Sequence, residues 1–151
     1  MDEALFDRPL EDQLCFRLYR ASNGLGKMYT RALQPFQLTF SQYLVLLALW
    51  DKEHVVASEI GKRTGMGIGT LNPILKRLED HGWIQKTPHE SDKRATLISL
   101  TDKANSSKSD INRSILEELK ECQFEGIDLL ELMKQLHLLQ VQMDRMNRQR
   151  D

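Results

Sequence analysis

Apolar residues recur at helical spacing along much of the chain, and the most regular stretch covers residues 69–81. One stripe of this stretch holds Leu71, Ile74, Leu75 and Leu78. The opposite face carries Thr70, Asn72, Pro73, Lys76 and Arg77. An apolar stripe with this period predicts a helix that buries one side. The other side then presents a small polar and cationic surface to solvent.

Both ends of this predicted helix carry signals of their own. Pro73 is expected in about the first turn, where its missing N–H removes a donor that has no intrahelical partner. Gly82 follows the last turn, at a position where glycine ends many helices. The stretch is therefore expected to be a short helix with defined ends.

A second helix is expected before this helix and a β-hairpin after it. A shorter helix is expected over residues 57–64, burying Ala57 and Ile60 and ending at Gly65. Downstream, the β-rich runs 83–87 and 96–100 bracket the polar segment 88–95, which predicts a hairpin with a long charged tip. The expected fold is mainly α with a small β-hairpin wing, a winged helix-turn-helix lobe over about residues 39–101.

This order favours contact with a DNA duplex, because the second helix of a helix-turn-helix enters the major groove. Lys76 and Lys93 suit phosphates, and Thr70 and Asn72 suit base edges. Arg94, at the wing tip, suits a narrow and negative minor groove. The alternative is that these charges form an ordinary solvated face, but a basic hairpin following the helix-turn-helix favours DNA.

Helical segments flank the lobe, and we expect residues 9–35 and 102–148 to form dimerisation helices within one domain of residues 1–151. An N-terminal face, with Pro9 at a favoured start, holds Leu10, Leu14, Leu18, Ala21, Leu25 and Met28. A C-terminal three-four alternation holds Leu129, Leu132, Leu136, Leu139, Met143 and Met146. We name these six residues the C-terminal seam. It is expected to pair with a second copy, the alternative being that it packs on its own domain.

Two further segments have simpler expectations. A helix over about 102–121 places Ile111, Ile115 and Leu119 on one face, which is expected to help the pairing. Thr39 and Gln42 have the form of a capping box before a buried helix over residues 42–50. Tyr43 and Trp50 in that helix are interpreted as core, with no function assigned.

Charge and composition limit the class of protein. The formal net charge is −1, which argues against a protein that coats nucleic acid indiscriminately. Residues 57–101 nevertheless carry seven basic against five acidic side chains. The longest apolar run, residues 43–50, is too short to span a bilayer, and the acidic start Met1-Asp2-Glu3 is unlike a secretory signal. A cytoplasmic protein without membrane contact is expected.

Candidate chemistry centres on two cysteines, Cys15 and Cys122. Tyr19 and Ser22 share a helical face with Cys15, so a hydroxyl is expected to hydrogen-bond its sulfur and stabilise a thiolate. Cys122 is surrounded in sequence by the carboxylates of Glu118, Glu121 and Glu125, which oppose thiolate formation. Of the two thiols, Cys15 is therefore expected to react first with an oxidant. The alternative for a lone cysteine is a buried thiol that acts as a small hydrophobe.

Other kinds of site find little support. His54, His81, His89 and His137 show no i,i+4 pairing, so no metal site is expected, and the chain has no cofactor motif. A thiol peroxidase with catalytic turnover is the enzyme alternative, but the chain has no Cys-x-x-Cys, Gly-rich phosphate loop or nucleophile elbow. We therefore expect a regulator and not an enzyme.

Five segments together resemble a known family. They are LCFRLY at 14–19, KMY at 27–29, TFSQYL at 39–44, GTLNPILKRL at 69–78 and SDKR at 91–94. The chain up to about Thr101 is similar to the organic hydroperoxide-sensing repressors of the MarR family (OhrR type). The winged-helix motifs are shared by MarR proteins in general, and the N-terminal cysteine motif points to the redox branch.

The resemblance implies a dimeric repressor that leaves a pseudo-palindromic DNA operator when organic hydroperoxide oxidises Cys15. It implies that Tyr19 and Tyr29 hold the thiol, and a third tyrosine position is occupied here by Phe40. It places Thr70, Pro73, Lys76 and Arg77 in the major groove, and Arg94, supported by Asp92, in the minor groove. Two-cysteine members carry a resolving thiol in the region of Cys122, whereas one-cysteine members use small cellular thiols. An inter-subunit disulfide between Cys15 and Cys122 is therefore one expected outcome.

Helix geometry bears on the thiol site independently. Cys15 and Tyr29 are fourteen residues apart, which on one continuous helix corresponds to about 21 Å. Their contact therefore needs a partner subunit or a helix break at Gly24 or Gly26. A remaining alternative is a MarR repressor induced by a small phenolic or aromatic ligand, with both cysteines incidental.

Overall fold

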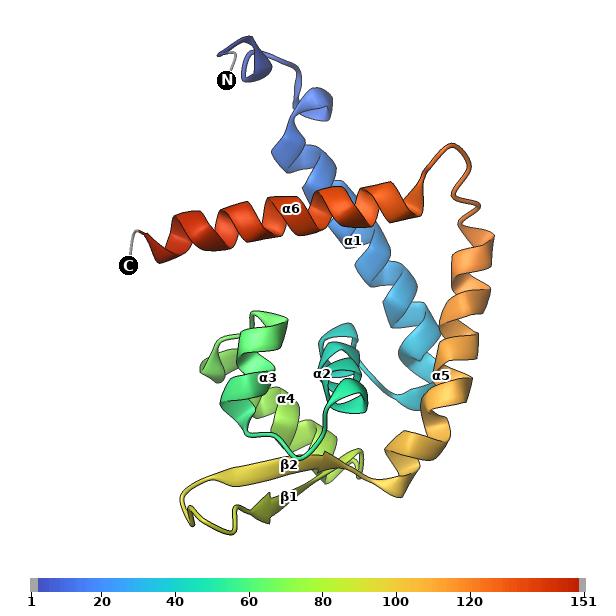
Figure 1. The fold of residues 1–151 in the computed structure, drawn as a ribbon. Helices are drawn as coiled ribbons and strands as arrows, with labels where there is room; N and C mark the ends of the chain where they lie inside the picture. The colour runs from blue at the N-terminus through green and yellow to red at the C-terminus, as the bar shows by residue number, and fades with distance from the viewer. Residues whose placement is uncertain (1–2, 150–151) are drawn as a thin grey trace. The chain divides into compact units, whose positions relative to one another are not determined.

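The computed structural model describes residues 3–149. The chain divides into two compact units, Met1–Leu119 and Lys120–Asp151. Short 3-10 turns are η1 (Glu3–Leu5), η2 (Leu10–Asp12) and η3 (Gln34–Phe36). The α-helices are α1 (Leu14–Leu33), α2 (Phe40–Asp51), α3 (Ala57–Thr64), α4 (Ile68–Asp80), α5 (Asp102–Glu121) and α6 (Leu129–Arg148). The strands are β1 (Ile84–Pro88) and β2 (Thr96–Leu100). Figure 1 shows this order along the chain, and it confirms the expected winged helix-turn-helix fold.

Helix α2 forms the floor of the first unit, and local signals define its start. The Thr39 hydroxyl accepts the Gln42 backbone N–H at 3.2 Å, and the Gln42 side chain accepts the Thr39 N–H at 3.0 Å. This is the expected capping box. Beyond it, Val45, Leu46 and Leu49 are almost fully buried. The helix begins two residues earlier than the sequence pattern alone indicated.

Helices α3 and α4 form the helix-turn-helix pair. Gly65 ends α3 at φ 75°, in the left-handed region that glycine enters without strain. In α4 the whole predicted stripe is buried, whereas the predicted polar face is exposed. At its end Trp83 N–H donates to the Leu78 carbonyl and Gly82 N–H to that of Glu79, which is a Schellman motif with Gly82 at φ 74°.

The expected position of Pro73 was wrong. Because α4 begins at Ile68, Pro73 is the sixth helical residue and lies in the second turn. Its missing N–H therefore leaves the carbonyl of Gly69 without its usual i+4 donor, a real cost within the helix. The N-terminal boundary shifted because Gly67, in extended conformation, takes the position before the first helical residue.

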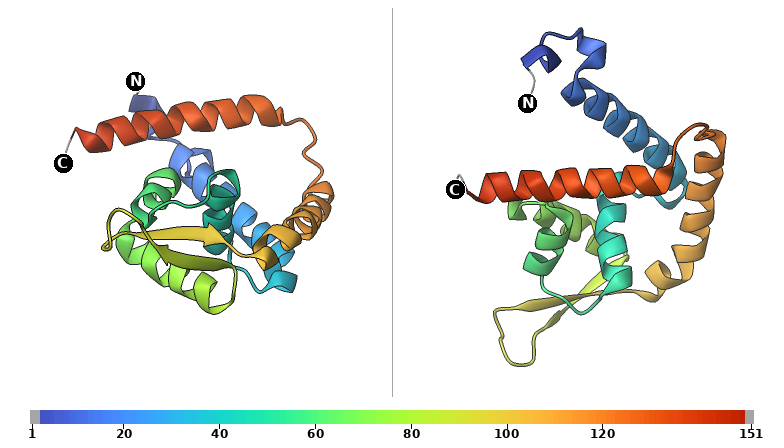
Figure 2. Two further views of the ribbon diagram at one scale, coloured as in Figure 1. Left: turned by 60° about the horizontal axis from the view of Figure 1, so that its bottom comes forward. Right: turned by 45° about the horizontal axis from the view of Figure 1, so that its top comes forward.

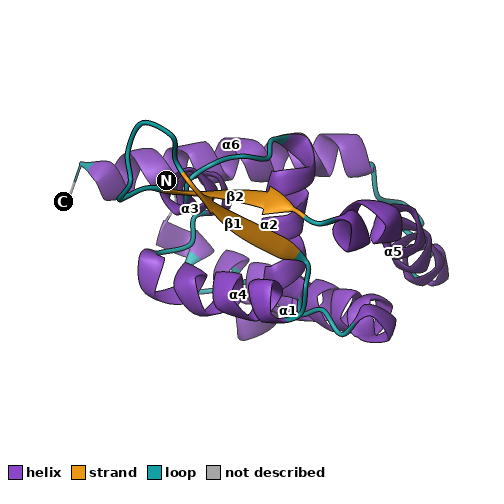
Figure 3. Cartoon of the chain, turned by 90° about the horizontal axis from the view of Figure 1, so that it is seen from below, coloured by secondary structure: helices purple, strands orange, loops and turns teal. Residues whose placement is uncertain are grey.

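The hairpin is a two-stranded antiparallel sheet in which Ile84 pairs with Leu100 and Pro88 with Thr96. Figure 3 shows these strands as the only sheet among the helices of the described chain. The loop before α3 joins the sheet, since Val55 and Ile98 exchange backbone hydrogen bonds of 3.3 and 2.8 Å. The loop at the far end of the hairpin projects away from α2–α4 (Figure 2).

Helix α1 is continuous from Leu14 to Leu33, so the helix break considered at Gly24 or Gly26 does not occur. Its C-terminal half contributes Met28, Ala32 and Leu33 to the core. The sequence had suggested that Pro9 starts this helix, but it does not. Pro9 precedes the short turn η2, and the extended Gln13 between η2 and α1 interrupts the helical spacing of the apolar residues.

Helix α5 uses its apolar face within the chain. Ile111 and Ile115 are buried in the core and Leu119 packs against it, so the expected role of this face in pairing was wrong. Two polar contacts reinforce the packing against α1. The Ser114 hydroxyl donates to the Ala32 carbonyl at 2.7 Å, and Arg31 pairs with Glu118 at 3.0 Å.

The second unit consists mainly of α6, which carries the C-terminal seam. Asp128 caps the helix, since its carboxylate accepts the Glu131 N–H at 3.0 Å. None of the residues of α6 is buried. Within residues 3–149, none of the helices has the length and apolar content needed to cross a bilayer.

Candidate nucleic-acid interface and reactive thiol

The exposed face of α4 carries all five of the side chains that the sequence assigned to the major groove: Thr70, Asn72, Pro73, Lys76 and Arg77. Lys76 forms an i,i+4 ion pair with Asp80 at 3.2 Å, and both side chains are more than half exposed. An exposed pair of this kind contributes little to stability, so a phosphate can displace the carboxylate at small cost. The structure thus brings these residues together on one solvent-facing surface.

The wing tip holds Asp92, Lys93 and Arg94, all exposed. The carboxylate of Asp92 accepts the backbone N–H of Arg94 at 2.9 Å. Asp92 therefore supports Arg94 through the main chain, and within the described chain the Arg94 guanidinium is left without a carboxylate partner. Five N–H donors are thus available at the wing tip for an anionic groove.

His89 fixes the other side of the same loop. Its Nδ1 accepts the Ser91 backbone N–H at 3.2 Å and lies 2.9 Å from the Ser91 hydroxyl. The backbone N–H of His89 donates to the Ala95 carbonyl at 2.9 Å, which closes the loop. These short-range bonds order the loop that presents Lys93 and Arg94.

Sequence reasoning missed the side chains that fasten the end of α4 to the start of α5. The Thr101 hydroxyl contacts the carbonyl oxygens of Gly82 at 2.6 Å and Trp83 at 3.2 Å. Lys103 donates to the His81 carbonyl at 2.8 Å and lies 4.4 Å from the centre of the Trp83 ring. The Trp83 carbonyl also accepts the Thr101 backbone N–H at 3.1 Å, so three consecutive carbonyls after α4 have a donor. The only sequence signal was the Thr101 position just before a predicted helix, where a capping residue is expected.

Cys15 is the second residue of α1 and is exposed. The first bond within α1 runs from Arg17 N–H to the Gln13 carbonyl, so the N–H groups of the first turn have no intrahelical acceptor. The expected hydrogen bond from Tyr19 or Ser22 to the sulfur is not formed in the described part of the chain, and Tyr19 is 64% exposed. The thiol is accessible to a small molecule from solvent.

Cys122 follows the last residue of α5 and is also exposed. It belongs to the second compact unit, whereas Cys15 belongs to the first. Both thiols are free, which is the state in which each can react. Within the single chain, neither cysteine is a buried small hydrophobe.

Tyr29 is far along α1 from Cys15 and is held by other aromatic rings. Its ring stacks on Phe40 with centroids 4.6 Å apart and on Tyr43 with centroids 5.7 Å apart. Tyr43 in turn meets the edge of Trp50 at 6.3 Å. Burial raises the pKa of the Tyr43 hydroxyl, and Tyr29 adds a smaller effect in the same direction. These contacts pack α1 against α2. Among the described residues no cluster of metal-ligating side chains is found.

Comparison with known proteins gives a consistent result. A sequence profile of the family described as Transcriptional regulator SarA/Rot matches residues 27–111. The organic hydroperoxide resistance transcriptional regulator of Bacillus subtilis is 39% identical over 133 residues, covering 86% of this chain and 88% of that protein. The regulator TtmR of Methylorubrum extorquens is 43% identical over 99 residues, covering 66% of this chain and 51% of TtmR. The chain thus spans about half the length of TtmR.

Solved structures agree with the sequence matches. AbfR, known from Staphylococcus epidermidis, has been solved in a reduced form bound to DNA, with a TM-score of 0.80 and 31% identity over 95% of this chain and 99% of that chain. Its disulfide form has a TM-score of 0.62 and 35% identity over 86% of this chain and 91% of that chain. These matches confirm the resemblance to hydroperoxide-sensing regulators. The chain therefore belongs to the family of DNA-binding winged helix-turn-helix transcriptional regulators of the SarA/Rot and MarR type.

Proposed function

We propose that this protein is a homodimeric repressor that leaves its DNA operator when organic hydroperoxide oxidises Cys15. The observation that carries the proposal is the exposed thiol at one end of an unbroken α1 whose other end lies in the core of the DNA-binding lobe. Because the Tyr29 ring stacks on two rings of the α2 region, a displacement of the thiol end is passed to the floor of that lobe.

DNA contact is assigned to α4 and the wing. The polar face of α4 enters the major groove, with Thr70 and Asn72 on base edges and Lys76 on a phosphate. Lys93 binds a phosphate, and Arg94 enters the minor groove. The exposure of these side chains and the DNA-bound structures of AbfR support this assignment.

The homodimer is supported by apolar side chains that remain unburied in the single chain. On α1 they include Leu14, Leu18 and Leu25, and on α6 every residue of the C-terminal seam. A second copy of the chain has the same faces, so a two-fold axis can bury both. The dimer then spaces two α4 helices roughly 34 Å apart, which is one turn of the duplex. The Tyr29 at the Cys15 thiol comes from the second copy, because the Tyr29 of the same helix lies about 21 Å away.

The proposed reaction has two steps. The Cys15 thiolate attacks the terminal oxygen of the hydroperoxide, the O–O bond breaks, and the products are a sulfenic acid and the corresponding alcohol. The thiol of Cys122 from the second copy then attacks the sulfenic sulfur, forming an inter-subunit disulfide and releasing water. A disulfide needs Cα atoms within about 7 Å, so its formation can reposition whole helices. The existence of a disulfide form of AbfR supports this second step.

The test is a DNA-binding titration on reduced protein with and without cumene hydroperoxide. The duplex is selected by the reduced protein from a randomised library, and the salt concentration is held constant because the phosphate contribution depends on it. Oxidant is expected to weaken binding of the wild type and to leave Cys15→Ser unchanged. Equal affinity of treated and untreated wild type would contradict the proposal. Release of Cys15→Ser by a phenolic compound would instead favour the ligand-induced alternative.

Non-reducing gels test the role of Cys122. Oxidised wild type is expected to run as a covalent dimer, and Cys122→Ser as a monomer. A wild type without an inter-chain species after oxidation would remove Cys122 from the mechanism and leave an external thiol as the resolving partner.

A further inference from the structure

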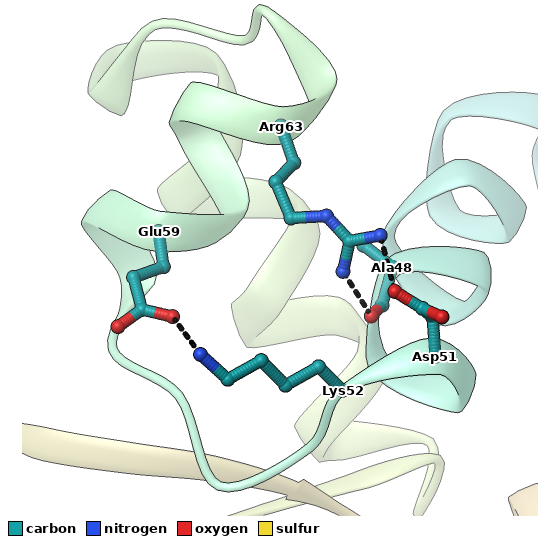
Figure 4. Close-up of polar contacts among 5 residues, drawn as sticks. All are labelled: Ala48, Asp51, Lys52, Glu59 and Arg63. Atoms are coloured by element: carbon teal, nitrogen blue, oxygen red, sulfur yellow. Dashed lines mark hydrogen bonds and ion pairs between the residues drawn. The ribbon is translucent and has the colours of Figure 1, made fainter.

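The Arg63 side chain of the DNA-binding lobe is 45% exposed, yet other residues of the lobe engage its guanidinium. Arg63, in the last turn of α3, donates through Nη1 to the Ala48 carbonyl at 2.8 Å. Through Nη2 it donates to Oδ2 of Asp51 at 2.7 Å. Both acceptors belong to the C-terminal end of α2, as Figure 4 shows. The Arg63 guanidinium is therefore partnered by the lobe itself, at its surface.

This contact matches the chemistry of arginine specifically. The guanidinium is a planar fork whose donors reach a carbonyl and a carboxylate at the same time, and the single ammonium of lysine does not reproduce that geometry. A positive charge at the C-terminal end of a helix also interacts favourably with the helix dipole. Arg63 thus caps α2 from a neighbouring helix.

Helix α3 depends on this contact because it has little apolar anchorage. Ile60 is the single buried residue in its eight residues. Ala57, at the start of the helix, is partly buried against the same core, and the C-terminal end of α3 has the least apolar packing. The Arg63 fork, one turn beyond Ile60, holds that end against α2. A second polar link, between Lys52 and Glu59, is a single contact of 3.5 Å between exposed side chains, longer than either bond of the Arg63 fork (Figure 4).

The inclination of α3 is passed directly to α4. The turn between them is short, and a Cβ at Gly61 of α3 would lie only 3.1 Å from the Met66 carbonyl. The backbones of α3 and of this turn are thus in close contact. A rotation of α3 therefore moves the face of α4 that carries Asn72 and Lys76.

We propose that Arg63 is a positioning residue for DNA binding, which sets the inclination of the helix-turn-helix pair by clasping the end of α2, and is not a phosphate ligand. The proposal concerns the reduced, DNA-bound state and needs no thiol chemistry. Its failure would leave the oxidation mechanism untouched, and failure of that mechanism would leave this proposal intact.

The first test separates positioning from phosphate contact. The affinity of reduced full-length protein for the selected duplex is measured by fluorescence anisotropy at several salt concentrations, for Arg63→Ala and Arg63→Lys. Positioning predicts that both variants bind about tenfold more weakly, the loss expected for a charge-assisted hydrogen bond, with the salt dependence unchanged. A phosphate ligand predicts that Arg63→Lys keeps its affinity and that the salt slope of Arg63→Ala falls by about one. That second result would overturn the proposal.

A matched pair of acidic variants provides the second test. Asp51→Asn and Glu59→Gln each remove one negative charge from the same corner of the lobe, and charge removal by itself favours binding to DNA. Because Asp51 holds Arg63, Asp51→Asn is expected to weaken DNA binding about threefold. The effect is smaller than for Arg63→Ala, because only the charge of one acceptor is lost and the hydrogen bond to the Ala48 carbonyl remains. Glu59→Gln is expected to bind at least as tightly as the wild type. Tighter binding by both variants would contradict the proposal.

Stoichiometric titration of each variant provides the control for folding. At concentrations far above Kd it reports the fraction of protein competent to bind, which partial unfolding lowers and a tilted helix pair does not. The competent fraction is expected to equal that of the wild type for all four variants. If an Arg63 variant shows a reduced fraction, the comparison of Asp51→Asn with Glu59→Gln decides alone.

Discussion

A single hydroxyl illustrates how burial sets chemistry in this protein. Tyr43 is 6% exposed, and desolvation raises the pKa of its hydroxyl above the ordinary value of 10.0, with a smaller contribution from Tyr29. The phenol therefore stays protonated in the folded protein at a pH where an unfolded chain has already begun to release its proton. The position serves packing, as the sequence indicated, and it also makes stability depend on alkaline pH.

The sign of that dependence follows from proton linkage. Between about pH 10 and the higher folded pKa, the unfolded state binds fewer protons than the folded state, so stability falls as pH rises. Tyr43→Phe removes this loss. In urea unfolding, the stability of Tyr43→Phe relative to wild type is expected to improve from about pH 8 to about pH 10.5. Tyr19→Phe, at an exposed position, serves as the control, and an equal change there would contradict the explanation.

Alanine substitutions at two exposed residues of the proposed interface are expected to affect DNA binding in different ways. Lys93→Ala is expected to weaken binding to every duplex and to lower the salt slope by about one, because a phosphate contact carries no sequence information. Asn72→Ala is expected to relax base preference at one position with the slope retained. Binding-site selection and salt titration of both variants measure these effects. A relaxed preference in Lys93→Ala would contradict the assignment.

At the scale of elements, α4 has one feature that destabilises the helix and one that stabilises it. Pro73 withholds a donor from the Gly69 carbonyl, whereas the Gly82 motif satisfies the carbonyls at the other end. Thr101 and Lys103 then fasten that end to α5. The end contacts and the buried stripe therefore offset the one intrahelical hydrogen bond that Pro73 removes.

Two glycine substitutions test whether the left-handed conformation of Gly82 contributes to stability. Gly82→Ala is expected to cost about 1 kcal/mol of stability, because an L side chain at φ 74° is strained. Gly69→Ala is expected to add about 0.5 kcal/mol, since nothing lies within 4 Å of the added Cβ and alanine favours a helix. Thermal unfolding of both variants measures the two changes. A stabilised Gly82→Ala would contradict this account.

At the scale of the whole molecule, the unburied apolar faces of α1 and α6 have the greatest consequence. Leu136, in the C-terminal seam, is 43% exposed in the single chain. If a second copy covers the seam, Leu136→Glu places a charge in that interface, and the variant is expected to be monomeric and to bind DNA more weakly. Light scattering after size exclusion measures the mass. His137→Glu, off the seam by helical spacing, is expected to remain dimeric, and a dimeric Leu136→Glu would contradict the interface.

The local architecture was predictable from the sequence because its signals lie within a few residues of one another. Periodicity identified the stripe of α4, Thr39 and Gln42 identified the cap of α2, and the two β-rich runs identified the wing. The exposed groups of the interface followed from the same pattern, since the face opposite a buried stripe must meet solvent. The helix starts at Leu14 and Ile68 were missed, since extended residues just before them decide where each helix begins.

The sequence by itself thus determined the type of fold, the polar face of α4 and the candidate thiol. Only the tertiary structure decided which charges are free and which are partnered within the chain. It paired Arg63 with the end of α2 and left Arg94 without a carboxylate partner among the described residues, and it buried the face of α5 that the pattern had left available for pairing. The physical reason is distance along the chain. Periodicity reports which side of a helix is apolar, but the neighbour that covers it comes from residues far away in sequence.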